Sequence, residues 1–94
     1  MEIKNIIWLD SIVDKLLWKH NVTQNEIIQI FNNKPHIRFV EKGFIVDENV
    51  YSALNQTDRG RYLIIFFVYK LSKSILIISG RDMTDKERRY YEKH

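Results

Sequence analysis

Cysteine is absent from the 94-residue sequence, and proline and glycine are scarce, with one and three residues respectively. Without cysteine, the chain can form neither a disulfide nor a thiolate metal site. A content of 45% hydrophobic and 29% charged residues excludes a disordered chain. No apolar stretch is long enough to cross a membrane, and residues 1–4 lack the features of a signal peptide. We therefore expect one domain over residues 1–94, located in the cytoplasm.

Three further kinds of site are also missing from the sequence. The glycines at positions 43, 60 and 80 are too dispersed for a glycine-rich phosphate loop. The histidines at positions 20, 36 and 94 lack the spacing of metal ligands, and no nucleophile elbow is present. We therefore expect no metal site and no cofactor. Any chemistry has to come from arginine, lysine, histidine, glutamate and tyrosine.

Basic residues outnumber acidic ones by 15 to 12, and the whole excess lies in the second half. Residues 1–47 carry six of each sign, whereas residues 48–94 carry nine basic and six acidic side chains. Five of the six arginines also lie there: Arg59, Arg61, Arg81, Arg88 and Arg89. Because arginine binds phosphate through two parallel hydrogen bonds, this distribution is compatible with an anionic partner. An ordinary solvated basic surface is the alternative.

The N-terminal residues predict a short strand followed by a helix. Apolar residues within positions 3–8 suggest the strand, although a coiled approach to the helix is also possible. Asp10 is expected to cap a helix over residues 11–20, whose apolar side chains fall on one face. Asn21 is expected to end this helix in the left-handed conformation.

A second helix is expected directly after the first. Thr23 and Glu26 have the spacing of a capping box, in which each side chain accepts a hydrogen bond from the other's backbone N–H. Pro35 ends the helix because proline cannot continue the hydrogen-bond ladder.

Beyond this proline the apolar period changes to two, which predicts strands. They are expected over residues 37–40, 50–56, 61–69 and 75–78. Gly43 permits a turn into residues 44–46, and residues 57–60 have strong turn chemistry. The 61–69 segment is apolar on both faces, so we expect it in the middle of the sheet.

Thr84 and Glu87 form another capping-box pair, which predicts a C-terminal helix that ends near Lys93. The order of these elements predicts an α+β fold. It comprises two N-terminal helices, an antiparallel β-sheet meander and the C-terminal helix.

The available side chains suit the cleavage of RNA by its own 2′-hydroxyl group. That reaction needs a base for the hydroxyl proton, an acid for the leaving oxygen, and positive charge at the phosphorane. It requires neither a metal ion nor a protein nucleophile. Six residues are candidates for these roles: Arg61, Arg81, His20, Glu48, Lys19 and Tyr51.

Each candidate also has a structural alternative, and for Glu48 and Tyr51 it is a purely structural position at the start of a strand. Arg61 begins the predicted central strand and could be a surface residue at its edge. Arg81 follows the last predicted strand and could pair with Asp82 or another carboxylate. Lys19 and His20 are favourably placed cations at a helix C-terminus.

The predicted C-terminal helix carries a stripe of Lys86, Arg89 and Lys93, which could guide a nucleic-acid backbone. Residues 81–93 hold five basic and four acidic side chains, however. A solvated face of mixed charge is therefore the alternative.

Short motifs follow one another along nearly the whole chain. They are Ile7-Trp8-Leu9-Asp10, Lys19-His20-Asn21-Val22-Thr23 with Glu26 and Ile30-Phe31, Glu48-Asn49-Val50-Tyr51-Ser52-Ala53-Leu54, Gly60-Arg61-Tyr62-Leu63, Ile77-Ile78-Ser79-Gly80-Arg81-Asp82-Met83, and Glu87-Arg88-Arg89-Tyr90-Tyr91-Glu92. In this order they resemble the BrnT family, the ribonuclease toxins of bacterial type II toxin–antitoxin pairs.

The resemblance implies a small fold like that of the RelE-type ribonucleases and an RNA-cleaving activity that suppresses translation. It also implies a neutralising BrnA-type antitoxin with a ribbon-helix-helix DNA-binding part. The complex of the two would form the oligomer and repress its own operon, so operator DNA would be bound only through the antitoxin. No membrane partner is implied.

The family's functional positions are carried over onto Lys19, His20, Glu48, Arg61 and Arg81. In this interpretation the two arginines clamp the scissile phosphate, and His20 or Glu48 is the base. Lys19 or Tyr51 assists proton transfer or neutralises charge. The sequence departs from the family pattern at Asn21, where glycine is usual, and at Gly80, where alanine is usual.

Two other functions are compatible with the sequence. One is a catalytically inactive RNA- or protein-binding module of the same fold, which the modest net charge favours. The other is an obligate interaction partner that binds only protein, since its five tyrosines and five phenylalanines could anchor an interface.

Overall fold

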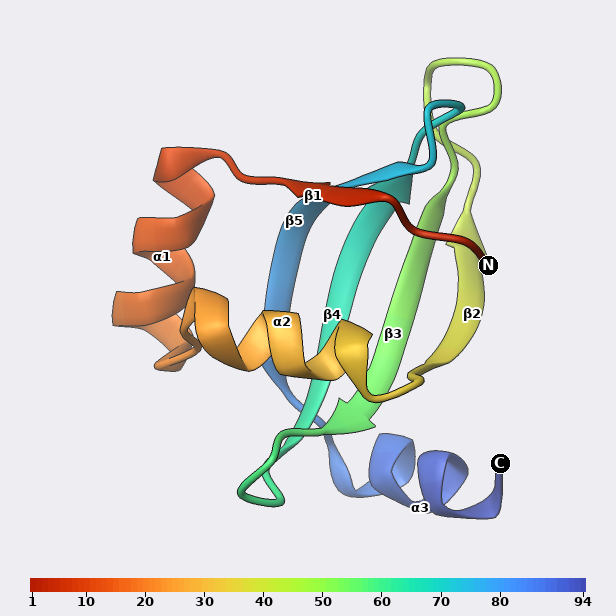
Figure 1. Cartoon of the computed structure of the whole chain (residues 1–94). Helices are drawn as coiled ribbons and strands as arrows, with labels where there is room; N and C mark the ends of the chain where they lie inside the picture. The colour runs from red at the N-terminus through yellow and green to blue at the C-terminus, as the bar shows by residue number, and fades with distance from the viewer.

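A five-stranded sheet, with strand order β1-β5-β4-β3-β2, forms the centre of the computed structural model, which describes all 94 residues (Figure 1). The elements in chain order are β1 (Asn5–Ile7), α1 (Asp10–His20), α2 (Gln24–Asn32), β2 (His36–Glu41), β3 (Val50–Gln56), β4 (Tyr62–Tyr69), β5 (Ser74–Asp82) and α3 (Asp85–Lys93). The predicted α+β class is confirmed. None of the three helices has the length and apolar character needed to cross a membrane.

The sheet is mixed, not purely antiparallel. Strands β2 to β5 form the expected antiparallel meander, with β4 in the middle. β1, however, pairs in parallel with β5, where Asn5 lies opposite Ser74 and Ile7 opposite Leu76. The chain enters both strands from the same end of the sheet, since the turn before β5 lies beside the residues that precede β1. The expectation of a simple meander was therefore wrong for this edge.

Helices α1 and α2 cover one face of the sheet, with α1 beside β5 and α2 across the middle strands (Figure 1). The core lies between these two layers. Leu16 of α1 and Ile27 and Ile30 of α2 pack with the inward-facing side chains of β4 and β5. Helix α3 lies at the end of the sheet where β3 ends and β4 begins.

Capping signals place the helices as predicted. In α2 the N–H of Thr23 donates to Glu26 Oε1 over 3.0 Å, and the N–H of Glu26 donates to Thr23 Oγ1 over 3.1 Å. Thr84 and Glu87 make the same reciprocal bonds at the start of α3. Asn21 ends α1 with a φ of 53°.

The start of α1 differs from the prediction. Leu9 is its N-cap residue and makes no side-chain capping bond, so Asp10 already lies in the first turn. The carboxylate in the first turn still favours the helix dipole, but it does not cap the helix.

The last strand is longer than predicted and reaches Asp82, so Arg81 lies within it. A bulge at Ile78 shifts the register between β4 and β5. Beyond it, Gly80 faces the core opposite Ile65 and Arg81 faces the other side opposite Ile64. The apolar run in the sequence ends at Ile78, because the last four residues of the strand, Ser79–Asp82, are small or polar.

Residues 44–46 form part of an exposed loop without strand structure, although Gly43 was expected to lead into an extended segment. Phe44 and Val46 project into solvent from this loop, which extends beyond the sheet (Figure 1). A side chain at Gly43 would overlap the backbone carbonyl of Glu48, so the loop closes tightly at that glycine.

Asn55 is buried on β3 and links three elements. Its amide nitrogen donates to the carbonyls of Ile30 (3.0 Å) and Asn33 (2.9 Å) at the end of α2. Its amide oxygen accepts from the N–H of Gln56 (2.8 Å) and from the hydroxyl of Tyr91 on α3 (2.9 Å). This side chain therefore determines how α2 and α3 meet the end of the sheet.

Replacement of Asn55 by leucine should destabilise the fold by about 3 kcal/mol, because two carbonyls, one backbone N–H and one hydroxyl lose their partner. Tyr91→Phe removes only one of these bonds and should cost about 1 kcal/mol. Urea unfolding followed by circular dichroism measures both values. Equal losses in the two variants would contradict the central role of Asn55.

Candidate functional site

Four of the six predicted site residues gather around the end of β5. Lys19 and His20 end α1, Arg61 immediately precedes β4, and Arg81 lies on β5. Arg61 connects the group, because its Nη2 donates to the backbone carbonyl of His20 over 2.9 Å and it also binds Asp82, the neighbour of Arg81.

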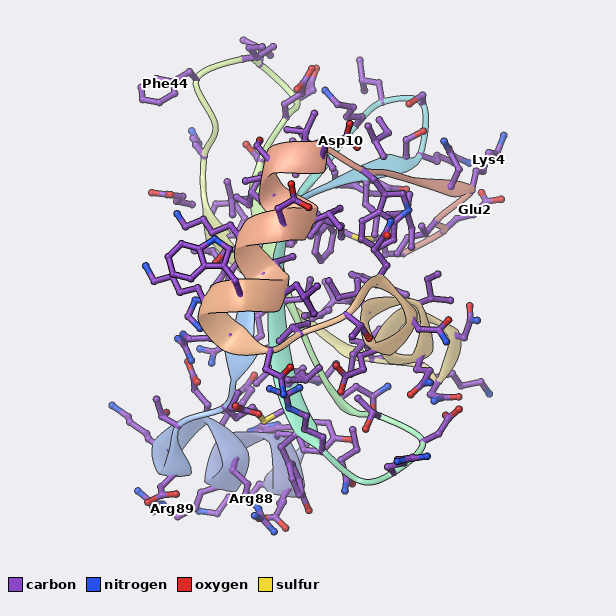
Figure 2. The ribbon with its side chains drawn as sticks, turned by 90° about the vertical axis from the view of Figure 1, so that its left-hand side faces the viewer. Glu2, Lys4, Asp10, Phe44, Arg88 and Arg89 are labelled. Atoms are coloured by element: carbon purple, nitrogen blue, oxygen red, sulfur yellow. The ribbon has the colours of Figure 1, made fainter.

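Glu48 and Tyr51 do not join this group. Tyr51 pairs with Phe67 on β4, whereas Arg81 pairs with Ile64, and three residues of strand span about 10 Å. The Tyr51 ring packs beside the Phe67 ring in the core. Glu48 accepts a 2.8 Å bond from Lys70. Figure 2 shows the two ends of the molecule, with the Phe44 loop at one and Arg88 and Arg89 of α3 at the other.

Arg61 uses all of its N–H groups within the protein. Nε and Nη2 bind the two carboxylate oxygens of Asp82 over 2.8 and 3.2 Å. Nη1 lies 3.2 Å from both oxygens of Glu26 and donates to the carbonyl of Asn21 over 2.6 Å. The remaining donor on Nη2 binds His20, as described above. The side chain is three-quarters buried.

These contacts make Arg61 a clamp between the end of α1, the capping box of α2 and the end of β5. Hydrogen bonding to Asp82 raises the pKa of Arg61, and the same bond lowers the pKa of Asp82. A phosphate group would have to displace these carboxylates in order to bind Arg61. Direct phosphate contact by Arg61 therefore stays a prediction, whereas its clamping role is visible in the structure.

Arg81 lies on the opposite face of the sheet from Asp82 and keeps some of its donors available. Nη1 and Nη2 bind the two oxygens of Glu87 on α3 over 2.7 and 3.0 Å. The hydrogen bond to Glu87 raises the pKa of Arg81, and the hydrogen bond from Arg81 lowers the pKa of Glu87. Nε and one N–H of Nη2 have no protein partner, and the side chain is 35% exposed. Arg81 can therefore still donate two hydrogen bonds to an anion.

His20 and Lys19 lie on the other side of the same strand end. His20 is partly buried and borders a small hollow beside Ile78 and Ser79 of β5. Its charge contributes to lowering the pKa of Asp82, although less than Arg61 does. Lys19 is exposed and forms no ion pair. The end of β5 thus has His20 and Arg61 on its helix-covered side and Arg81 on its opposite face.

A second group of chemically active side chains was missed by sequence reasoning. His36 Nε2 lies 2.9 Å from the hydroxyl of Tyr90, and the guanidinium of Arg38 lies 4.0 Å above the Tyr90 ring. The ring of His94 packs against Tyr90 and lies 5.6 Å from that of His36. Burial, followed by the charges of His94 and Arg38, lowers the pKa of His36.

The signals for this group were weak because its two halves lie more than 50 residues apart. His36 and Arg38 occupy alternate positions of one strand, and Tyr90 and His94 are one helical turn apart. Only the fold brings the halves together. The structure contains no group of three or more histidine, cysteine, aspartate or glutamate residues that could hold a metal ion.

All three residues of the predicted basic stripe of α3 lie at the surface. Lys86, Arg89 and Lys93 are exposed and form no ion pairs, whereas Arg88 lies 3.7 Å from Glu92 and 3.9 Å above the Tyr62 ring. The helix therefore presents unpaired positive charge beside an aromatic surface.

Comparisons with known proteins agree with this architecture. Residues 8–87 match the family model described as the ribonuclease toxin BrnT of a type II toxin–antitoxin system. The fold is similar to the crystal structure of the ribonuclease toxin BrnT from Brucella abortus, with a TM-score of 0.63 and 14% sequence identity over 86% of this chain and 97% of that chain. At this identity the similarity shows the fold alone. No curated protein matches the sequence significantly.

Arg61→Met should destabilise the protein by about 2–4 kcal/mol, because two carboxylates and two carbonyls lose their donor. Arg59→Met is the matched control, since Arg59 is exposed in the adjacent turn and forms no ion pair. The control should stay within about 0.5 kcal/mol of the wild type. Urea unfolding measures both, and equal stabilities would contradict the clamp.

Stability should fall in acid as the pH drops below about 4.5, because the pKa values of Asp82 and Glu87 are lowered in the folded chain. The unfolded chain then binds protons before the folded chain does. The pKa of His36 is also lowered in the folded chain, so this histidine should reduce stability as the pH drops below its ordinary value of 6.5. Urea midpoints between pH 7 and pH 3 measure this loss.

Glu87→Gln should lower stability at pH 7 and flatten the decline in acid. Asp14→Asn, at an exposed position of α1 without an ion pair, is the control and should leave the curve unchanged. An unaltered acid decline in Glu87→Gln would contradict the assignment.

Proposed function

We propose that this chain, which belongs to the BrnT family of ribonuclease toxins from type II toxin–antitoxin systems, cleaves RNA and thereby inhibits translation. The family match over residues 8–87 is the observation that carries the proposal. The matched segment includes both arginines and the Lys19–His20 pair. The same proposal includes a fold like that of the RelE-type ribonucleases.

The proposed reaction is attack of the 2′-hydroxyl on the adjacent phosphate, which breaks the bond to the 5′ oxygen of the next nucleotide. The base removes the hydroxyl proton, and the acid returns a proton to the leaving oxygen. Fixed positive charge stabilises the phosphorane-like transition state. The proposal requires no metal ion and no cofactor.

Arg81 is the proposed phosphate ligand because two of its N–H groups remain available. His20 is favoured over Glu48 as the base, since Glu48 pairs with Lys70 at the other end of the sheet. Lys19 is favoured over Tyr51 as the assisting group, because Tyr51 also lies away from the strand end that bears Arg81. Arg61 would then act by positioning, because it binds the carbonyl of His20 and the neighbour of Arg81.

Type II systems pair a protein toxin with a protein antitoxin, so the family implies an antitoxin partner. The finer proposal is a BrnA-type antitoxin with a ribbon-helix-helix part, which would carry the complex to operator DNA and determine its oligomeric state. Exposed apolar side chains support a protein interface. They include Leu17 and Trp18 on α1 and residues 44–46 in the loop after β2.

Induced expression of the wild type in a bacterial host should arrest growth and shorten cellular RNA. Arg81→Ala should reduce cleavage by about 100-fold to 1,000-fold, because one donor to the developing charge is lost. Arg59→Ala is the control and should stay toxic. Growth curves, RNA gels and a purified-protein cleavage assay are the measurements, with circular dichroism to verify folding.

Folded wild-type protein that leaves growth and RNA intact would contradict the ribonuclease proposal. Such protein that still retained labelled RNA would support the alternative, a catalytically inactive RNA-binding module. Co-expression of a ribbon-helix-helix protein encoded beside this chain should restore growth if the antitoxin proposal holds.

A further inference from the structure

A polar cavity of about 530 Å³ opens where α3 meets the end of the sheet. It is a hollow that stays widely open to solvent, so it can accommodate part of a longer chain but does not enclose a ligand. Its lining includes Lys34, His36, Gln56, Tyr62, Tyr91 and Glu92. None of the six candidate residues predicted from the sequence contributes to it.

The lining offers the groups that recognise a nucleobase. Tyr62 and Tyr91 pack edge to face with ring centroids 6.0 Å apart, and Arg88 stacks on the Tyr62 ring. Unpaired RNA bases stack on aromatic rings and form hydrogen bonds through their edges. The amide of Gln56 makes only one long bond, 3.3 Å to the carbonyl of Gly60, which leaves its oxygen without a partner. The Gln56 amide oxygen can therefore contact a base edge, whereas the Glu92 carboxylate already accepts from the Tyr62 hydroxyl over 3.4 Å and lies 3.7 Å from Arg88.

One cation without an internal counterion, Lys34, lines the cavity, and a second, Arg38, lies on the neighbouring strand β2. Lys34 is exposed on the loop before β2 and forms no ion pair, and Arg38 stacks on Tyr90 without a carboxylate partner. Arg61 and Arg81, by contrast, are bound to carboxylates. Glu92 is the only acidic residue in the lining. An incoming phosphate would thus find one unneutralised lysine, Lys34, in the lining.

We propose that this cavity binds one nucleotide of the RNA strand, with its base against the aromatic side chains and its phosphate at Lys34. The inference rests on the proposed ribonuclease function and assigns the cavity a role in substrate binding. Glu87, which binds Arg81, and Glu92, which lines the cavity, are separated by about 7.5 Å of helix. In this proposal the RNA strand runs from Arg81 past α3 to the cavity.

Lys34→Asn tests the phosphate contact. Lys34 has a φ of 55°, a conformation that asparagine tolerates, so the substitution removes charge without adding backbone strain. Binding of a short fluorescein-labelled single-stranded RNA, measured by anisotropy at low salt, should weaken by about threefold to fivefold. The slope of log affinity against log salt should become shallower by about 0.7.

Lys73→Asn is the matched control. Lys73 is also a lysine with positive φ, 66°, but it lies in the turn at the other end of the sheet. The substitution removes the same charge as Lys34→Asn. It also breaks the ion pair between Lys73 and Glu2, which is exposed and therefore contributes little to stability. RNA affinity and salt slope should remain those of the wild type.

Gln56→Leu tests the base contact. Titration with AMP, GMP, CMP and UMP should show a preference in the wild type that is reduced at least about fivefold in the variant, since a lost edge contact removes discrimination. Identical RNA affinity and salt slope in Lys34→Asn and Lys73→Asn, or an unchanged nucleotide preference in Gln56→Leu, would overturn the proposal.

The two proposals fail in distinguishable ways. Wild-type protein that binds RNA through Lys34 and Gln56 but never cleaves it would leave the cavity assignment intact and remove the ribonuclease function. If the wild type cleaves RNA and Lys34→Asn has an unchanged KM, the ribonuclease function stands and the cavity assignment is overturned.

Discussion

One guanidinium group, that of Arg61, joins three segments that are distant in sequence. The turn that ends at Gly60 fixes the position of Arg61. In this turn the N–H of Thr57 donates to the carbonyl of Arg61, and the N–H of Arg61 donates to the hydroxyl of Thr57. From there the side chain reaches the end of α1, Asp82 at the end of β5, and Glu26. Glu26 also completes the capping box of α2. A turn, a helix cap and a strand end thus share one hydrogen-bonded network, and the candidate site is built on it.

The two arginines that sequence reasoning singled out serve different purposes in this network. Arg61 is saturated by protein acceptors and holds the backbone in place, whereas Arg81 combines a structural bond to Glu87 with two available donors. Because Glu87 also caps α3, Arg81 determines how that helix begins, and Tyr91 binds Asn55 near its end. Helix α3, which borders the cavity, is therefore held at both ends.

Most features that depend on neighbouring residues were predicted correctly from the sequence, although the Asp10 cap and the extended segment after Gly43 were not. The capping boxes at Thr23 and Thr84, the left-handed Asn21 and the apolar central strand all depend on a few adjacent side chains. The parallel pairing of β1, the length of β5 and the meeting of His36 with Tyr90 depend on contacts across the whole chain. The arginines could be recognised by type and position, but their partners could not, since several carboxylates were equally available before the fold was known.

The parallel contact between β1 and β5 also determines when the molecule can assemble during synthesis. Asn5 finds its partner only at Ser74, and Arg61 finds Asp82 only 21 residues after itself. Pairings of such large sequence separation form slowly, because the intervening chain must first be ordered. A nascent chain that has not yet emerged from the ribosome as far as residue 74 therefore cannot pair β1 with β5, and one that lacks residue 82 cannot form the clamp. Helices α1 and α2 can form early, but they are joined to the strand end that bears Arg81 only after residue 82 has emerged.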